Sequence, residues 1–226
     1  MNLKLGRDKL HEILKTNGLL VRKTKRYHIT TDSKHRFYKS PNLVKDLKIS
    51  HAEQAFAADI TYIHTDQGHT YLALVTDLYS KKIMGWQYAD NMKAELVINA
   101  LKMAKKNCIH NQKEIIHHSD RGIQYCCPAF SDYTNKNGFV LSTTQQYDPY
   151  ENAVAERING ILKYEFGLKE TIANETIARK MISQAVKIYN EKRLHWSLDF
   201  RTPQEAHSQF NTQICKSYKR TNVVVG

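Results

Sequence analysis

The sequence lacks the features that mark several specialised classes of protein. Its four cysteines form no CxxC pair, and Cys126 and Cys127 are adjacent, which suits neither a disulfide framework nor a structural zinc site. No apolar run is long enough to span a membrane, and the polar, basic start is no secretory signal. There is no internal repeat. With 41% hydrophobic residues among 226, we expect one large domain with a small appendage, in a reducing cytoplasm.

Acidic residues are scarce relative to basic ones, and the imbalance is strongest at the start of the chain. The net charge is +12. Residues 1–50 hold 13 Lys and Arg against 4 Asp and Glu, which leaves +9 in this segment. So dense a positive charge indicates a polyanionic partner, most simply nucleic acid, rather than a merely solvated surface.

Within this basic segment, apolar spacing predicts a helix over 7–19, and the absence of an apolar period predicts an extended arm over 21–50. The arm begins with side chains expected to contact DNA phosphates, namely Arg22, Lys23, Lys25 and Arg26. Its aromatic residues Tyr27, Phe37 and Tyr38 could stack on bases or pack on the main domain, and both interpretations stay open. We therefore expect a basic segment at 1–50, a core at 51–210 and a basic tail at 211–226.

Apolar patterning predicts a mixed sheet flanked by helices in the core. Strands are expected near 55–64, 70–77, 83–88, 114–119 and 139–142, because these runs are apolar, β-prone and bounded by turn residues. Helices are expected near 92–107, 128–137, 152–166 and 174–191, with a last short one after Pro203. Three sequential strands, then strands alternating with helices, indicate an α/β fold with five strands.

Three acidic residues mark these predicted elements. Asp59 lies in the apolar run 56–63, Asp120 follows Ile115–Ser119, and Glu156 lies in a helical pattern after the turn-like Asp148-Pro149. Hard divalent cations prefer carboxylate oxygens, and three carboxylates would repel one another without a cation. We therefore expect the three to meet and hold divalent metal, with which phosphodiester chemistry is commonly performed.

The helix that carries Glu156 supports this expectation. Asn152 and Lys163 lie four residues before and seven residues after Glu156, so the three share nearly one helical face. That face would present an amide, a carboxylate and a cation to one ligand, and Lys163 could meet a DNA phosphate beside the metal.

Each acid taken alone has an ordinary explanation as a turn residue, a cap or a solvent-facing helix residue. Other acids are expected to lie outside the site: Asp66 belongs to a turn, and Asp77 is expected to bond its own turn near Ser80. The polar and aromatic cluster 189–198, which includes Arg193, could clamp DNA or anchor the C-terminal helix.

Two adjacent histidines, His117 and His118, are not expected to share a zinc ion. Neighbouring strand positions point to opposite faces of a sheet, and no cysteine pair completes a site. Either histidine could line the catalytic edge, although an ordinary hydrogen-bonded histidine is the simpler explanation for each.

Several short motifs follow one another between residues 55 and 205. They are Ala58–Tyr62, Val75–Ser80 with Gly85-Trp86, His118–Tyr125, Glu151–Arg157 with Leu162-Lys163, and Tyr189-Asn190, Arg193, His195, Ser197-Leu198 and Thr202-Pro203. Glu156 lies 36 positions after Asp120. In this order and spacing the chain resembles the integrase core of insertion-sequence transposases, specifically the second-frame (OrfB-type) proteins related to retroviral integrases.

The resemblance implies a ribonuclease-H-like fold in which Asp59, Asp120 and Glu156 form the catalytic, metal-binding acidic triad (DDE type), with Mg²⁺ or Mn²⁺ as cofactor. It implies DNA cleavage and strand transfer at element ends, that is, DNA integration and transposition. Lys163 matches the family's basic residue after the glutamate. The expected partners are DNA, other copies of the chain in a homo-oligomer on DNA, and a first-frame helix-turn-helix protein; no membrane is expected, and DNA binding would associate the protein with the nucleoid.

One departure from the family leaves an alternative. The helix at 7–19 looks like the end of an upstream helix-turn-helix region, of which the family usually has more. The alternative is therefore an N-terminally truncated, catalytically silent DNA-binding remnant, and a structure-selective nuclease on the same fold is a weaker third option. Glu151 replaces the family's usual aspartate, with little expected effect on metal binding.

Overall fold

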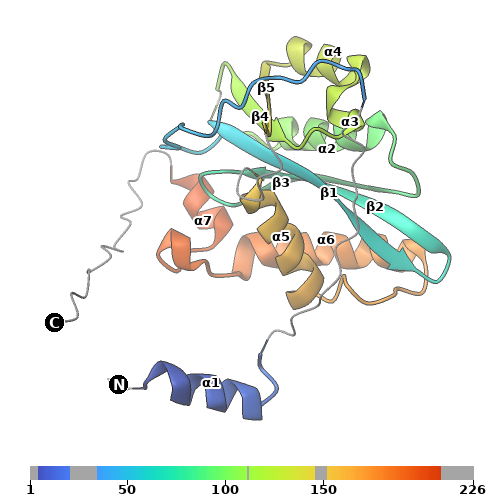
Figure 1. Cartoon of the computed structure of the whole chain (residues 1–226). Helices are drawn as coiled ribbons and strands as arrows, with labels where there is room; N and C mark the ends of the chain where they lie inside the picture. Colours follow the sequence, from blue (N-terminus) through green and yellow to red (C-terminus); the bar gives the residue numbers. More distant parts are fainter. Residues whose placement is uncertain (1–4, 21–34, 111, 146–151, 210–226) are drawn as a thin grey trace.

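A computed structural model describes residues 5–20, 35–110, 112–145 and 152–209. Five strands form one mixed sheet in the order β3-β2-β1-β4-β5 (Figure 1). They are β1 (Ala55–Thr65), β2 (Gly68–Asp77), β3 (Ile83–Ala89), β4 (Ile115–Ser119) and β5 (Phe139–Thr143). The first three pair antiparallel, whereas β4 and β5 follow helices and run parallel to β1. The predicted five-stranded α/β fold is confirmed.

Helices cover both faces of this sheet. One face carries α2 (Ala94–Lys106), α3 (Ile123–Cys126) and α4 (Pro128–Lys136), and the other carries α5 (Ala153–Glu165) and α6 (Glu175–Lys192). A 3₁₀ helix (Trp196–Leu198) and α7 (Pro203–Ser208) follow. The N-terminal helix α1 (Arg7–Thr16) has no buried residue. Within the described ranges, no helix has both the length and the apolar character needed to cross a membrane.

The alternation of β1 decides which side chains reach which face. Phe56, Ala58 and Ile60 pack in the core beneath α2, α3 and α4, whereas Ile63 packs in the core beneath α5 and α6. Because side chains alternate along a strand, Asp59 shares the face of Ile63. The strand therefore presents one carboxylate to the helix that carries Glu156.

Gly85 allows α2 to lie directly on β3. A Cβ at this position would stand 2.1 Å from the carbonyl oxygen of Ala100 and 2.5 Å from the amide nitrogen of Ala104. Both are backbone atoms of α2, so they could move only with the whole helix. The glycine in the Gly85-Trp86 motif is thus required by close packing.

The described part of the predicted arm lies against the core. The Leu43 amide donates to Ser142 Oγ (2.9 Å), and Thr143 Oγ1 donates to the Ser40 carbonyl oxygen (2.6 Å), which ties this segment to β5. Val44 and Ile49 pack against β1 residues. Tyr38 is 80% exposed.

The sequence prediction missed two short elements, α3 and the 3₁₀ helix, because neither is long enough to show a periodic pattern.

Candidate functional site

Asp59 and Asp120 are brought together by the pairing of β1 with β4. The two strands run parallel and pair only through Ala55, Phe56 and Ala57, with Ala57 opposite His118. Two residues further along, the same register sets Asp59 beside Asp120, at the point where β4 has ended. Both acids are partly exposed, because the pairing of β1 with β4 ends at Ala57; on its other edge β1 is still paired with β2, where Asp59 lies opposite Leu74. The Asp120 carboxylate also accepts a hydrogen bond from the Gly122 amide (3.0 Å), which fixes the turn after β4.

Helix α5 is attached to β1 beside these acids by two asparagines. Asn152 Nδ2 donates to the Ala58 carbonyl oxygen (3.1 Å), and Asn159 Nδ2 donates to Asp59 Oδ2 (2.8 Å). Glu156 lies between them in the first turn of the helix. Asn159 was not predicted from the sequence, although it lies three residues after Glu156 and therefore on the same helical face.

The electrostatics show that the three acids act on one another. Burial and the charge of Asp120 raise the pKa of Asp59 from 3.8 to about 7, with a smaller contribution from Glu156 and against the hydrogen bond from Asn159. Burial and the Asp120 charge also raise the pKa of Glu156. The segments carrying these acids therefore concentrate negative charge in one place, where a cation would relieve the repulsion.

The surrounding polar atoms suit a hydrated divalent cation. Within the described residues, the amide oxygens of Asn152 and Asn159 are buried without a hydrogen-bond partner. Metal-bound water would satisfy such atoms. The carboxylate oxygens of Asp59, Asp120 and Glu156 do not all lie within 4.8 Å of one another. Two ions about 3.5–4 Å apart would suit ligands that are spread more widely than a single ion requires.

Lys163 lies close enough to Asp59 for that charge to affect its ammonium group. Burial lowers the pKa of its ammonium group, and the charge of Asp59 partly opposes this effect. Tyr125 on α3 is buried, and its pKa is raised by burial and by the charges of Asp120 and Asp59. Lys163 thus lies on α5, whereas Tyr125 packs in the core on the other face of the sheet.

Comparisons with known proteins agree with this arrangement. Family models described as "Integrase core domain" match residues 50–149 and residues 137–203. A 31 kDa protein of insertion element IS600 from Shigella sonnei is 32% identical over 204 residues, covering 88% of this chain and 74% of that protein. The chain belongs to the integrase-core family of insertion-sequence transposases.

Further members of this family are named transposases. InsF of insertion sequence IS3A from Escherichia coli K12 is 31% identical over 80% of this chain and 64% of InsF. The transposase of IS629 from Shigella sonnei is 32% identical over 72% of this chain and 54% of that protein. Family membership places the chain among proteins of DNA transposition and integration. Since it spans less than two thirds of these two relatives, the activity of a whole transposase is carried over below only as a proposal.

Solved structures show the same fold as this integrase core. A chain of the simian T-cell lymphotropic virus intasome matches with a TM-score of 0.61 at 17% identity, over 79% of this chain and 61% of that one. The HTLV-2 integrase catalytic core, solved in complex with magnesium in a dimeric form, matches with a TM-score of 0.55 at 16% identity, over 69% of this chain and 97% of that one. These likenesses confirm the ribonuclease-H-like fold.

The remaining residues predicted to contact DNA are either engaged within the protein or lie outside the described residues. Arg193 donates two hydrogen bonds to the Glu165 carboxylate (2.6 and 2.8 Å), so its guanidinium is engaged within the protein and joins α6 to α5. This geometry favours the anchoring role for Arg193, and DNA contact stays a prediction. Arg22, Lys23, Lys25 and Arg26 lie outside the described residues, as do Glu151 and the tail 211–226.

The acids and histidines set aside in the sequence lie outside the acid cluster. Asp77 Oδ2 accepts hydrogen bonds from the Ser80 amide (2.7 Å) and hydroxyl (2.6 Å), which confirms its role in its own turn. His117 is buried against Tyr125 and Phe130, and burial lowers its pKa to about 3. His118 Nδ1 instead bonds Ser142 Oγ (2.8 Å). The two histidines face opposite sides of the sheet, as predicted.

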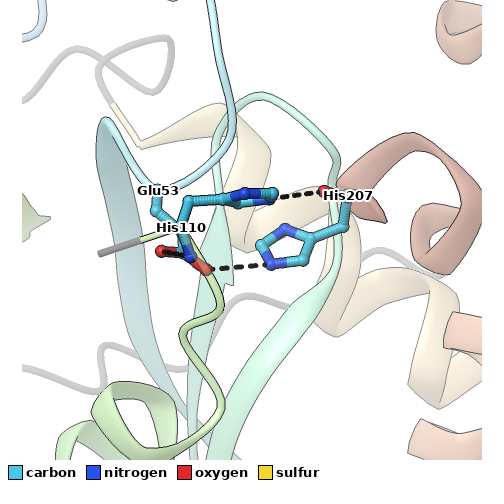
Figure 2. Close-up of side chains that lie close together, drawn as sticks. All are labelled: Glu53, His110 and His207. Carbon is cyan, nitrogen blue, oxygen red and sulfur yellow. Dashed lines mark hydrogen bonds and ion pairs between the residues drawn. The ribbon is translucent and has the colours of Figure 1, made fainter. Parts of the chain in front are cut away.

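Sequence reasoning missed a second polar cluster, formed by Glu53, His110 and His207 (Figure 2). Glu53 precedes β1, His110 follows α2, and His207 lies in α7. Glu53 and His207 are 154 residues apart, so no local motif could have shown that they are in contact.

Proposed function

We propose that this chain is a DDE-type polynucleotidyl transferase in which Asp59, Asp120 and Glu156 hold Mg²⁺ or Mn²⁺ and which cleaves element-end DNA and joins it to target DNA. The observation that carries the proposal is the placement of the three carboxyls: Asn159 on the Glu156 helix donates to Asp59 (2.8 Å), and, after burial, the charge of Asp120 raises the pKa of both Asp59 and Glu156. The magnesium complex of the HTLV-2 integrase core supports the same class of ion.

The reaction would proceed in two displacements at phosphorus. Water attacks a phosphodiester at the element end and the bond to the 3′ oxygen breaks, which leaves a 3′-hydroxyl. That hydroxyl then attacks a target phosphodiester, forms the new strand bond and releases a target 3′-hydroxyl. The bound cations would neutralise charge on the phosphate and lower the pKa of the attacking group.

The protein's own residues would position the carboxylates and the DNA. Asn159 holds Asp59 Oδ2 in one orientation, and Asn152 fixes the start of α5 on β1. Lys163, on the same face of α5 as Glu156, would contact a DNA phosphate; burial lowers the pKa of its ammonium group and the charge of Asp59 partly opposes this, which supports a position beside the acids. Arg22, Lys23, Lys25, Arg26 and Asn152 complete the proposed DNA contacts.

The proposed assembly is a homo-oligomer on DNA, in the compartment that holds the DNA. The HTLV-2 core has been solved in dimeric and trimeric forms, and the simian virus relative was solved as an intasome. A first-frame helix-turn-helix partner remains part of the proposal. The silent-remnant alternative is not favoured, because matches to the integrase core run without a break from residue 50 to residue 203.

The test is strand transfer with the full chain. A duplex carrying the inverted repeat that flanks the gene, with its 3′ end already exposed, is incubated with plasmid target and Mn²⁺. We expect joined products with the wild type and none with Asp120→Asn. Asp66→Asn, an exposed turn acid, is the matched control and should join normally. Joining by Asp120→Asn at the wild-type rate would overturn the triad, and salt-sensitive binding without joining by the wild type would establish the remnant.

A further inference from the structure

The cluster of Glu53, His110 and His207 has no part in the proposed reaction, yet it has the composition of a metal site. One ligand atom from each residue lies within 4.8 Å of the other two. Glu53 and His207 are completely buried, and His110 is half-buried. Figure 2 shows the two imidazole rings one above the other, with the Glu53 carboxylate at their side.

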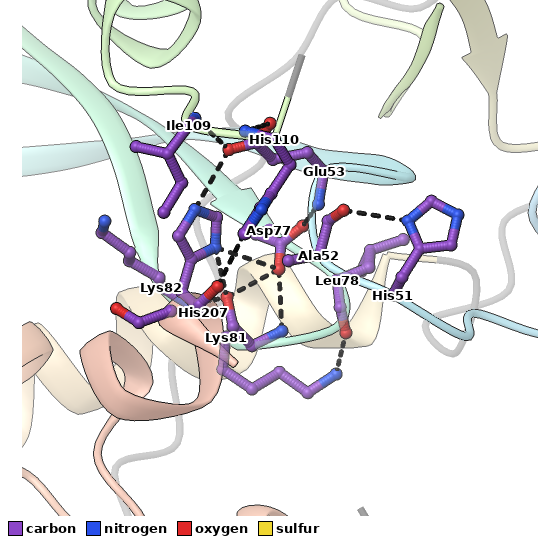
Figure 3. A network of polar contacts seen from close by, with 12 residues as sticks. His51, Ala52, Glu53, Asp77, Leu78, Lys81, Lys82, Ile109, His110 and His207 are labelled. Atoms are coloured by element: carbon purple, nitrogen blue, oxygen red, sulfur yellow. Dashed lines mark hydrogen bonds and ion pairs between the residues drawn. The ribbon is translucent and has the colours of Figure 1, made fainter. Parts of the chain in front are cut away.

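Figure 3 shows His207 within a network of polar contacts that includes Asp77 and Glu53. Two hydrogen bonds of Ser80 fix the protonation of one His207 nitrogen. The Ser80 hydroxyl donates to Asp77 Oδ2 (2.6 Å), because an ionised carboxylate can only accept. Toward His207 Nδ1, at 3.2 Å, the Ser80 oxygen is therefore the acceptor, and Nδ1 carries the hydrogen. A hydrogen-bonded Nδ1–H that leaves Nε2 for the metal is the usual arrangement of a metal-binding histidine.

The other nitrogen, Nε2, faces Glu53 Oε1 at 3.2 Å. That carboxylate is held in place by two backbone donors, the amides of Ile109 (2.6 Å) and His110 (3.0 Å). A nitrogen lone pair and a carboxylate oxygen would repel each other, so a positive species must lie between them. That species is either a second proton on His207 or a metal ion.

The geometry is compatible with the metal ion. In a tetrahedral site with Zn–N and Zn–O bonds of about 2.0–2.2 Å, neighbouring ligand atoms stand about 3.3–3.5 Å apart, close to the 3.2 Å found here. His110 Nε2 bonds the carbonyl oxygen of His207 (2.8 Å), which holds the ring beside His207, and one of its ring nitrogens lies within 4.8 Å of the ligand atoms of Glu53 and His207. Two imidazoles and one carboxylate favour zinc over magnesium, which prefers oxygen ligands alone.

We propose that Glu53, His110 and His207 bind a divalent transition-metal ion of the Zn²⁺ class, with Asp77 and Ser80 orienting His207. The ion would join α7 to the start of β1 and to the segment after α2, three parts of the chain that are distant in sequence. His207 lies beyond the ranges 50–149 and 137–203 that the integrase-core models match.

The test uses the full chain carrying Asp120→Asn, so that zinc held by the acid cluster is reduced. The protein is stripped with EDTA, given equimolar Zn²⁺, passed through a desalting column and measured for bound zinc and for unfolding temperature. We expect one retained zinc per chain and a higher unfolding temperature. His110→Ala should weaken zinc binding at least tenfold.

Two further variants keep the result decisive. His69→Ala is the matched control, because His64 and His69 form an exposed cross-strand pair (2.9 Å between Nδ1 atoms) that could itself chelate metal. It should retain zinc fully. His207→Gln tests the buried ligand if circular dichroism shows a folded protein. Zinc lost on desalting with no change in unfolding temperature would mean that a proton alone occupies the position, and equal retention by His110→Ala would place the zinc elsewhere; either result overturns the proposal.

Discussion

Glu53 and Asp59 lie six residues apart on one stretch of chain, and their surroundings shift the pKa of the two carboxyls in opposite directions. Burial acts to raise the pKa of Glu53, but hydrogen bonds from His207 and from the amides of Ile109 and His110 outweigh it. Burial also raises the pKa of Asp59, and the neighbouring charge of Asp120 raises it further.

The difference teaches how to distinguish a structural acid from a functional one in this fold. In the metal-free protein the donors to Glu53 come from the protein itself, so this charge is compensated in the folded chain even before the proposed zinc binds. At Asp59 the protein supplies two donors, the side chain of Asn159 and the amide of Ile60, but it also places two further carboxylates nearby, and burial and their charges still raise the pKa. A cation from outside would compensate this charge. An acid whose pKa is raised by neighbouring carboxylates, and which lies where the adjacent strand has ended, is the better candidate for chemistry.

The largest expected effect is on strand transfer. Asp59→Asn and Glu156→Gln should each lower the joining rate by about 10²–10³-fold or more, as expected for removal of a group that stabilises charge in the transition state. Initial rates on a pre-exposed 3′ end would measure this. If Asp59→Asn left the joining rate unchanged, the distinction between Asp59 as a functional acid and Glu53 as a structural acid would fail.

The second largest effect is expected on the stability of the protein when Glu53 is changed. Glu53→Gln should lower the free energy of unfolding by about 3–5 kcal/mol, because it leaves the buried His207 without its carboxylate partner. Urea unfolding monitored by circular dichroism gives the value. Asp59→Asn, measured alongside in metal-free buffer, should destabilise far less or stabilise; equal losses in both variants would contradict the proposed distinction.

The pH dependence should separate the same two acids. A carboxyl whose pKa is raised from 3.8 to about 7 contributes stability that is complete below about pH 3.8 and is lost as the pH rises through about 7. The difference in unfolding free energy between the wild type and Asp59→Asn should therefore move against the wild type between pH 4 and 7. Saturating Mg²⁺ at pH 8 should restore the wild type only, and a pH-independent difference would contradict the shift.

A smaller effect is expected at Asn159. Asn159→Ala removes the donor to Asp59 Oδ2 and should weaken Mg²⁺ or Mn²⁺ binding by about 10–100-fold, the range for a residue that orients a metal ligand. Asn135→Ala, at an exposed position of α4, is the control. Calorimetric titration with Mn²⁺ would show the difference, and unchanged affinity in Asn159→Ala would remove it from the site.

The smallest effect is expected at Arg193. Its pair with Glu165 is partly exposed, so Arg193→Ala should cost about 1 kcal/mol or less in stability. DNA affinity should fall more in Lys163→Ala than in Arg193→Ala, because the Arg193 guanidinium is already paired with Glu165. Filter binding at two salt concentrations measures both, and the reverse order would assign Arg193 to the DNA.

Local patterns in the sequence, together with the family resemblance, are enough to indicate the strands, most helices and the three acids. Asp59 and Asp120 each stand beside apolar strand residues, and Glu156 lies in a periodic helix, so all three carry local signals. Asn159 has the helical spacing but no obvious chemistry. The contact between Glu53 and His207 has no local signal, because it depends on how α7 returns to the start of β1 after 154 residues.

The central claim is that one cation pocket joins the two strand-borne aspartates to the glutamate of α5. Crystals of the full chain soaked in Mn²⁺ test it most directly through anomalous scattering. The account predicts density for one or two ions in contact with Asp59, Asp120 and Glu156, and none in Asp120→Asn. Clear density for the three side chains with no anomalous signal between them at saturating Mn²⁺ would contradict it.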